Sequence, residues 1–280
     1  TRDAAGVVAV EAASDGARGM GIGFAAARGE RYLGFGERSN AVDQRGNDVE
    51  EIRAHFTICA EGAATKFARS LGRDRDLDFP MGFAIRQYFT SPMESSGWFE
   101  GYLEIRSGED TLPGYGWVFP VGDGTVNVGV GLLSTFGGWR DVNLHHLQNS
   151  FVEGLPPEWE INPDTVVSKP RAGRLFMGGS VWPPHGPGFI LVGDAAGMIN
   201  PMNGEGIAYG YETGRIAGRH IDEALRDGRS PSLTDYSEDL KATYGPYYRL
   251  GRKFVGRIGN PALLGQQKAC AHGDAFCAPR

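Results

Sequence analysis

Asp194 is the residue best placed to do chemistry in this sequence, because it closely follows a short apolar run, Phe189 to Val192, that is flanked by glycines. Such a run is typical of a buried parallel strand. A carboxylate in this position stands at the carboxyl end of the strand, where open α/β sheets bind their ligands. The spacing therefore predicts a ligand-binding carboxylate at Asp194.

A loop and a helix follow this carboxylate. The loop holds Asn200, Pro201, Asn203 and Gly204, and we expect a helix from about Glu205 to Arg226 with Asn203 as its N-cap. The first-turn amides of such a helix point back into the loop. They are suited to an anionic or electron-rich ligand.

The whole stretch resembles the second flavin fingerprint of flavoproteins with the p-hydroxybenzoate-hydroxylase fold. It reads Gly-Asp-Ala-Ala-Gly from Gly193 and Asn-Pro-Met-Asn-Gly-Glu-Gly-Ile from Asn200. The resemblance implies FAD as cofactor, with Asp194 bonded to the ribityl chain and the amides of 204–206 at the flavin pyrimidine edge. The implied FAD contacts here are Gly193, Asp194, Ala195, Pro201, Asn203, Gly204, Glu205, Gly206 and Ile207. A generic strand–turn–helix is the alternative, since Gly-Asp alone is common.

A second motif lies between a strand predicted at Phe56 to Ala60 and a short helix predicted at Thr65 to Leu71. It resembles the Asp-Gly fingerprint of the same flavoproteins, which lies near the FAD pyrophosphate. The resemblance implies FAD contacts for Glu61, Gly62 and Arg69. Glu61 departs from the family's Asp by one methylene. The alternative for Arg69 is a salt bridge on a helix face.

Residues 79–133 read as antiparallel strands with aromatic residues on one face. We expect strands at 81–89, 98–105, 113–120 and 125–133, with a hairpin turn at Val121-Gly-Asp-Gly124. Such a sheet offers an apolar pocket wall.

One block of these strands resembles the signature of geranylgeranyl reductases. It contains Tyr115, Trp117 and Phe119 at alternate positions before a proline, and then Gly129 and Gly131. The resemblance implies that the three aromatics line a prenyl site and that the two glycines allow close approach of the prenyl chain. An uncharged polyprenyl chain is recognised by buried apolar area, at about 25 cal/mol per Å². The alternative is that these aromatics are ordinary core residues of strands.

Composition narrows the class of protein. The chain has 280 residues, 41% of them hydrophobic and 22% charged, which is ordinary for a globular protein. Its net charge of −6 disfavours a nucleic-acid partner. No histidine has metal-ligand spacing, so we expect no metal site. Three cysteines form no even framework, no apolar run is long enough to span a membrane, and we expect a cytoplasmic protein.

Residues 1–50 differ from the rest. The stretch from Glu30 to Asn47 resembles the end of the amino-terminal β-sandwich of family-31 α-glucosidases and α-xylosidases. No catalytic barrel follows, and neither catalytic aspartate of that family has a counterpart. No Gly-x-Gly-x-x-Gly unit for the FAD adenosine is present either. We therefore expect an incomplete FAD-binding domain that holds FAD weakly.

We expect an α/β (α+β) fold with an incomplete Rossmann-like FAD domain and an antiparallel substrate domain. The predicted divisions are a β-rich, glycosidase-like segment at 1–50, partial FAD domain at 51–78 and 166–230, substrate domain at 79–165, helical segment at 231–264 and a disordered tail at 265–280. In the helical segment, bases alternate with aromatics from Tyr247 to Arg257. This pattern fits a membrane-surface contact or a packed helix with solvated bases.

The functional hypothesis is an FAD-dependent oxidoreductase of the geranylgeranyl reductase type, which reduces prenyl double bonds of an isoprenoid lipid or prenylquinone. NAD(P)H or ferredoxin would be the electron donor, and no residue is assigned as the proton donor. The alternatives are an FAD-dependent aromatic-ring monooxygenase, a family-31 glycosidase fragment and a non-enzymatic lipid-binding protein. We expect a cytoplasmic location, peripheral at a membrane.

Overall fold

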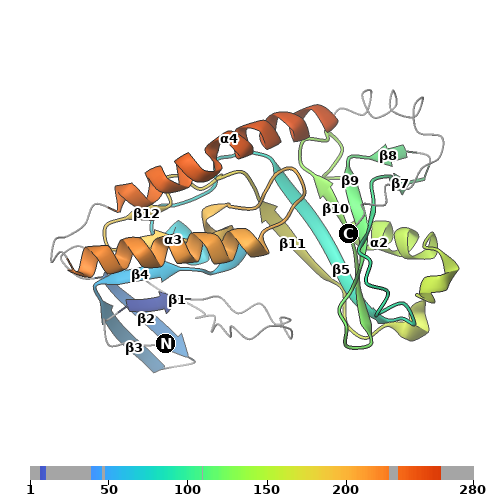
Figure 1. Cartoon of the computed structure of the whole chain (residues 1–280), viewed down its shortest axis with the longest axis horizontal. Coiled ribbons are helices and arrows are strands. Elements are labelled where there is room, and N and C mark those ends of the chain that lie inside the picture. Colours follow the sequence, from blue (N-terminus) through green and yellow to red (C-terminus); the bar gives the residue numbers. More distant parts are fainter. Residues whose placement is uncertain (1–6, 11–38, 46–47, 109, 227–232, 260–280) are drawn as a thin grey trace. The chain divides into compact units, whose positions relative to one another are not determined.

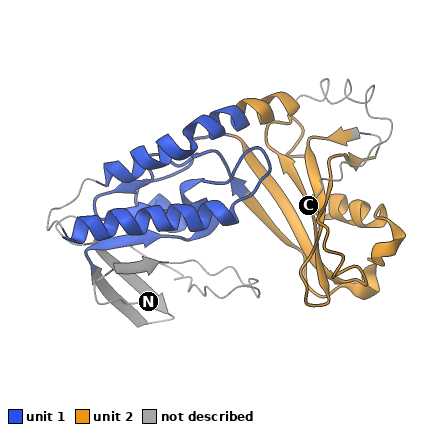
Figure 2. Ribbon diagram, viewed as in Figure 1, with its two compact units in different colours: residues 1–79, 175–252 blue, residues 80–174, 253–280 orange. Residues whose placement is uncertain are grey.

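The computed structural model describes residues 7–10, 39–45, 48–108, 110–226 and 233–259 (Figure 1). The predicted tail at 265–280 lies outside them. The chain divides into two compact units, residues 1–79 with 175–252 and residues 80–174 with 253–280 (Figure 2). The first division lies next to the predicted one between 78 and 79. The second lies further along the chain than the predicted one between 165 and 166.

The first unit contains a four-stranded sheet. Its order is β1 (Val7–Val10), β4 (Phe56–Cys59), β13 (Phe189–Leu191) and β12 (His185–Gly186). β1 and β13 both run parallel to β4, and β12 is antiparallel to β13. All three residues of β13 are buried. The predicted buried parallel strand before Asp194 is therefore confirmed.

The amino-terminal region contributes to this unit. β1 pairs with β4, and β2 (Ser39–Arg45) forms an antiparallel hairpin with β3 (Asp48–Ala54). The predicted boundary between residues 50 and 51 falls inside β3. The glycosidase resemblance rests on residues 30–47, of which only 39–45 are described.

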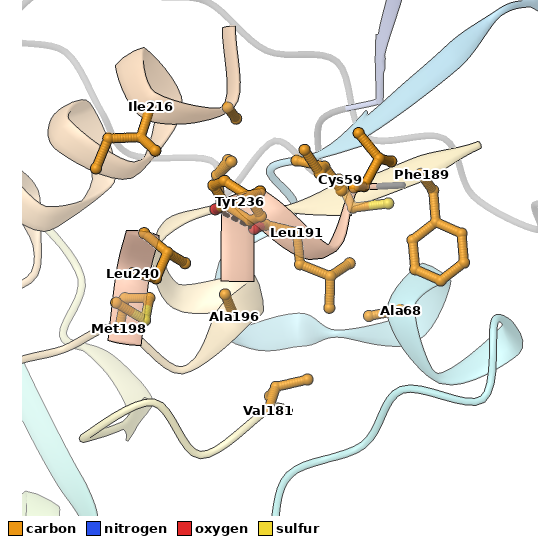
Figure 3. Packing of buried hydrophobic residues seen from close by; sticks show 14 of the residues in the cluster. Cys59, Ala68, Val181, Phe189, Leu191, Ala196, Met198, Ile216, Tyr236 and Leu240 are labelled. Atoms are coloured by element: carbon orange, nitrogen blue, oxygen red, sulfur yellow. Dashed lines mark hydrogen bonds between the residues drawn. The ribbon is translucent and has the colours of Figure 1, made fainter. Parts of the chain in front are cut away.

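Two helices build the core of the first unit, α3 (Ile207–Arg226) and α4 (Thr234–Ile258), the latter up to residue 252. Their apolar residues pack with those of β4 and β13 around Leu191 and Leu240 (Figure 3). The fully buried Tyr236 of α4 donates a hydrogen bond of 2.8 Å to the Leu191 carbonyl oxygen. Because a buried hydroxyl needs a partner, this bond fixes α4 on the strand that leads to Asp194.

The second unit contains a five-stranded sheet in the order β11-β5-β10-β9-β6. The strands are β5 (Met81–Thr90), β6 (Glu100–Tyr102), β9 (Gly114–Pro120), β10 (Thr125–Leu133) and β11 (Arg171–Phe176). The pairs β5–β10, β10–β9 and β9–β6 are antiparallel. One face is a core that includes Ile85, Val118, Val126 and Val130. The predicted antiparallel sheet, and with it the mixed α/β class, is confirmed.

Local corrections follow from turns and caps. The strand predicted at 98–105 is broken into β6 and β7 (Ile105–Ser107), because β7 pairs with β8 (Asp110–Leu112) rather than with the large sheet. Helix α2 (Leu144–Glu153) begins after Asn143, whose side chain accepts hydrogen bonds from two first-turn amides. Strand β11 begins at Arg171, after the short turns η2 (Pro157–Trp159) and η3 (Pro163–Thr165).

Candidate functional site

Asp194 lies in the short 3₁₀ turn η4 (Gly193–Ala196), close behind β13. Gly193 has a φ of +56°, which favours glycine. Its amide donates to Thr213 Oγ1 on α3 over 2.9 Å, and the same hydroxyl donates to the Tyr209 carbonyl oxygen over 2.6 Å. These two bonds hold the turn against α3.

The carboxylate of Asp194 faces the loop that precedes α3. A Cβ added to Gly206 would lie 3.1 Å from Asp194 Oδ1, so glycine lets the loop backbone approach the carboxylate. No described residue donates a hydrogen bond to this carboxylate. Burial, and after it the Glu205 carboxylate, raises the pKa of Asp194 to about 6. A ligand hydroxyl that donates to Asp194 would favour its ionised form.

The loop itself is held by Asn200. Its side-chain oxygen accepts from the Met202 amide over 2.8 Å. Its backbone carbonyl oxygen accepts from the Gly204 amide over 2.9 Å, and its backbone amide donates to the Glu205 carbonyl oxygen over 2.9 Å. Gly204 has a φ of +72°, so a residue with a side chain would be strained there. The loop is therefore a closed turn with a defined backbone.

Helix α3 begins at Ile207, two residues later than predicted, and Asn203 is not its cap. The Asn203 side chain accepts from the Glu205 amide over 3.1 Å, inside the loop, and Glu205 Oε1 accepts from the Ala208 amide over 2.7 Å. Glu205 thus takes the capping role. The amides of Gly206 and Ile207 have no acceptor among the described residues. They remain open to a ligand.

Helix α4 supports the loop from behind. Tyr248 is buried and donates to the Met198 carbonyl oxygen over 2.6 Å, and Arg252 donates to the Gly178 carbonyl oxygen over 2.6 Å. A Cβ at Gly251 would lie 2.8 Å from Pro201 Cγ, so the helix packs closely on the loop. The sequence interpretation missed these roles, because it read Tyr248 and Arg252 only as part of a basic aromatic segment.

The Glu61 carboxylate has a structural partner. It is 6% exposed and accepts from the amides of Phe67 at 2.8 Å and Ala68 at 2.6 Å, at the start of α1 (Lys66–Ser70). A carboxylate at a helix N-terminus satisfies orphan amides and complements the helix dipole. The Glu61 carboxylate therefore caps α1. Its predicted contact with FAD stays a prediction.

The other residues of this motif, Gly62, Thr65 and Arg69, lie in three different surroundings. Gly62 has a φ of +68° in η1 (Gly62–Ala64), which packs against the Asp194 turn. The exposed Arg69 pairs with Asp74 over 3.2 Å, the salt bridge foreseen as the alternative to its FAD contact. The buried Thr65 hydroxyl has no partner among the described residues.

The predicted substrate residues lie together in the second unit. Tyr115, Trp117 and Phe119 project from the face of β9 opposite the valine core, with ring centroids 5.4 Å and 6.1 Å apart. Exposed Phe99 extends the row, 5.2 Å from Phe119. Trp117 Nε1 donates to Asn127 Oδ1 over 2.9 Å. The aromatics thus form a continuous, partly exposed wall.

The two glycines of the signature differ in their surroundings. A Cβ at Gly129 would lie 2.3 Å from Trp117 Cζ2, so the indole ring lies directly over this glycine. A Cβ at Gly131 would meet neighbours only at 3.6 Å or more. The close approach that Gly129 allows is therefore that of Trp117 itself.

Two negative findings concern the described residues alone. They contain no group of histidine, cysteine, aspartate and glutamate side chains that would hold a metal ion. None of their helices combines the length and apolar character that crossing a bilayer requires.

Comparison with known proteins adds sequence and fold relatives, although no protein-family model matches the chain. The chain is 41% identical over 216 residues to menaquinone reductase of Mycolicibacterium smegmatis, covering 76% of this chain and 50% of that protein. A geranylgeranyl bacteriochlorophyll reductase-like protein from Thermoplasma acidophilum superposes with a TM-score of 0.69 at 21% identity, covering 84% of this chain and 59% of the other. A flavoprotein/dehydrogenase from Cytophaga hutchinsonii superposes with a TM-score of 0.63 at 18% identity, covering 83% of this chain and 56% of the other.

The fold is thus that of flavin-dependent oxidoreductases. Within them, the sequence match to menaquinone reductase and the structural match to a geranylgeranyl reductase-like protein confirm the predicted resemblance to the geranylgeranyl reductase family. The chain spans about half the length of the curated relatives it matches.

Proposed function

We propose that this chain is the flavin- and prenyl-binding portion of an FAD-dependent reductase that reduces prenyl double bonds of a prenylquinone. The observation that carries the proposal is the Asp194 site, where a partly buried carboxylate faces the amides of Gly206 and Ile207, and neither side has a hydrogen-bond partner among the described residues. A flavin has groups that match both: hydroxyls on its ribityl chain can donate to the carboxylate, and carbonyl oxygens on its pyrimidine edge can accept from the amides. The 41% identity over 216 residues to a menaquinone reductase favours a quinone substrate.

The residues of the chain bind and orient under this proposal. Asp194 accepts a hydrogen bond from a ribityl hydroxyl, and the amides at the start of α3 donate to the pyrimidine oxygens. A flavin held there and reduced by NAD(P)H or ferredoxin would supply a hydride to one alkene carbon, and a proton from an acid or water would complete the reduction. Tyr248 and Arg252 keep the loop in place by bonding carbonyl oxygens behind it.

The aromatic wall is the proposed prenyl site. Tyr115, Trp117 and Phe119 present half-buried ring surface that an uncharged chain covers by apolar contact, at about 25 cal/mol per Å². Trp117 is fixed by Asn127 and by its packing on Gly129, so it forms a preorganised surface. Such a wall also excludes water from the ligand.

The visible absorption spectrum of the purified chain, before and after dialysis with FAD, tests the cofactor. We expect flavin uptake by the wild type, weaker uptake by Asp194→Asn, and wild-type uptake by Asp78→Asn, which changes an exposed aspartate of the same unit. A chain that takes up no FAD would refute the proposal. With uptake shown, mass spectrometry of a menaquinone incubated with the reduced protein distinguishes added hydrogen from the added oxygen of a monooxygenase.

The proposal extends to the membrane surface, where a cytoplasmic enzyme meets a lipid substrate. On α4, Tyr247, Leu250 and Phe254 are 71%, 64% and 41% exposed at helical spacing. Exposed Arg249, Lys253 and Arg257 flank them. Apolar side chains beside bases are typical of helices that lie on anionic lipid. Co-sedimentation with phosphatidylglycerol vesicles, lost in Leu250→Asp and absent with phosphatidylcholine, is the expected result. Equal binding by the variant would refute the contact.

A further inference from the structure

Arg86 stands within the aromatic wall of the second unit. The strand register pairs Arg86 of β5 with Gly129 of β10, and Gly129 with Trp117 of β9, so the three form one row across the sheet. The neighbouring row contains Tyr88, Asn127 and Phe119. Because side chains of one row share a face, the guanidinium and the aromatic rings lie on the same side of the sheet.

The indole ring of Trp117 covers the position that lies between Arg86 and Trp117 in this row. Gly129 has no side chain, and the Trp117 ring lies over it, 2.3 Å from where its Cβ would be. The single N–H of that ring is already bonded to Asn127 Oδ1. The tryptophan therefore offers apolar surface and no donor to a ligand.

The guanidinium of Arg86 has N–H donors that no described residue accepts. Its Cζ lies 4.9 Å from the centroid of the Tyr88 ring, a cation–π contact that uses the flat face of the guanidinium. Among the described residues no carboxylate pairs with Arg86, whereas Arg106, Arg219 and Arg226 each pair with an acid. A partly buried guanidinium with five N–H groups and no acceptor is suited to an oxygen of a ligand.

We propose that Arg86 is the anchor for the polar head of the prenyl ligand, and that it donates hydrogen bonds to the head's acceptor oxygens while the prenyl chain lies on the aromatic wall. The inference rests on the proposed function, since it assumes that the wall binds a prenyl chain. Quinone carbonyls and phosphates both present such oxygens. Either head would fix which double bond of the chain is positioned for reduction.

Calorimetric titration in mild detergent tests the proposal with three probes that share a short prenyl chain. One carries a menaquinone head, one carries a diphosphate head, and one is the head-free hydrocarbon. Arg86→Met keeps the stem over Tyr88 and removes the donors. Arg140→Met is the matched control, because Arg140 also lies over a ring, that of Trp139 at 4.3 Å, outside the wall rows.

We expect Arg86→Met to weaken the binding of a head-bearing probe by about tenfold or more, because charge-assisted hydrogen bonds are lost. Binding of the hydrocarbon should not change, and Arg140→Met should leave all three probes unaffected. A loss confined to the quinone or to the diphosphate identifies the source of the oxygens. If Arg86→Met weakens the binding of all three probes equally, or of none of them, the role of Arg86 as an anchor is refuted while the prenyl site stands. If the wild type binds none of them, the prenyl site and the anchor both fail.

Discussion

Replacing Asp194 by asparagine should stabilise the chain while weakening flavin uptake. The folded-state pKa of Asp194 is about 6 against an ordinary value of 3.8, because the carboxylate is buried and lies near Glu205. Near neutral pH the folded chain therefore carries a charge in a site that disfavours it. Asparagine has nearly the same shape and no charge, so it removes this cost.

The size and pH dependence of the effect follow from the shift. A difference of about two pKa units corresponds to about 3 kcal/mol, at roughly 1.4 kcal/mol per unit. Between about pH 4 and pH 6 the folded chain binds more protons than the unfolded chain, so the wild type loses stability as the pH rises through this window. The advantage of Asp194→Asn should be absent below about pH 4 and reach up to about 3 kcal/mol above pH 6.

Urea unfolding of both proteins, from about pH 4 to about pH 8 and without flavin, measures this difference. Added FAD should stabilise the wild type more than the variant, because only the wild type has the carboxylate that the ribityl hydroxyl bonds. A pH-independent difference between the two proteins would show that the carboxylate is not held in an unfavourable site. Destabilisation by Asp194→Asn near neutral pH, without flavin, would contradict the reasoning directly.

Three further substitutions probe the supports of the two sites, each followed by urea unfolding. Glu61→Gln should lower the free energy of unfolding by about 2 to 4 kcal/mol. Both Glu61 oxygens accept α1 amides, and glutamine replaces one of these buried oxygens by an NH₂ group that cannot accept. Tyr248→Phe should cost about 1 to 2 kcal/mol, because the buried Met198 carbonyl loses its donor. Gly129→Ala should cost about 1 to 3 kcal/mol and alter tryptophan fluorescence, because its Cβ would displace the Trp117 ring.

Each of these has a control nearby. Asp74→Asn alters an exposed salt bridge and leaves an oxygen for the exposed Arg75 amide, so it should change stability by less than about 1 kcal/mol. Tyr247→Phe alters an exposed hydroxyl and should be neutral. Gly131→Ala meets only ordinary van der Waals contacts and should be tolerated. Equal losses in a variant and its control would contradict the role given to Glu61, Tyr248 or Gly129.

The strand before Asp194 and the sheet with the aromatic row were predictable because their signals are local. An apolar run between glycines has few outcomes, and alternation over 125–133 places a valine row opposite an asparagine and glycine row. The start of α3 was missed because two acceptors compete there. Asn203 and Glu205 both suit a helix N-terminus, and only the closed loop around Asn200 assigns the cap to Glu205.

The roles of Glu61 and of α4 needed tertiary contacts. Glutamate in place of aspartate appears as a conservative departure, yet here its carboxylate bonds two backbone amides six and seven residues further on. Along α4, apolar and basic residues follow a helical period on more than one face, so the sequence could not show which tyrosine packs inward. Tyr248 is buried and donates to the Met198 carbonyl oxygen, whereas its neighbour Tyr247 faces solvent. A single helix can therefore both support the Asn200 loop with one face and expose aromatic and basic side chains on another, so the packed-helix and membrane-surface interpretations of this segment do not exclude each other.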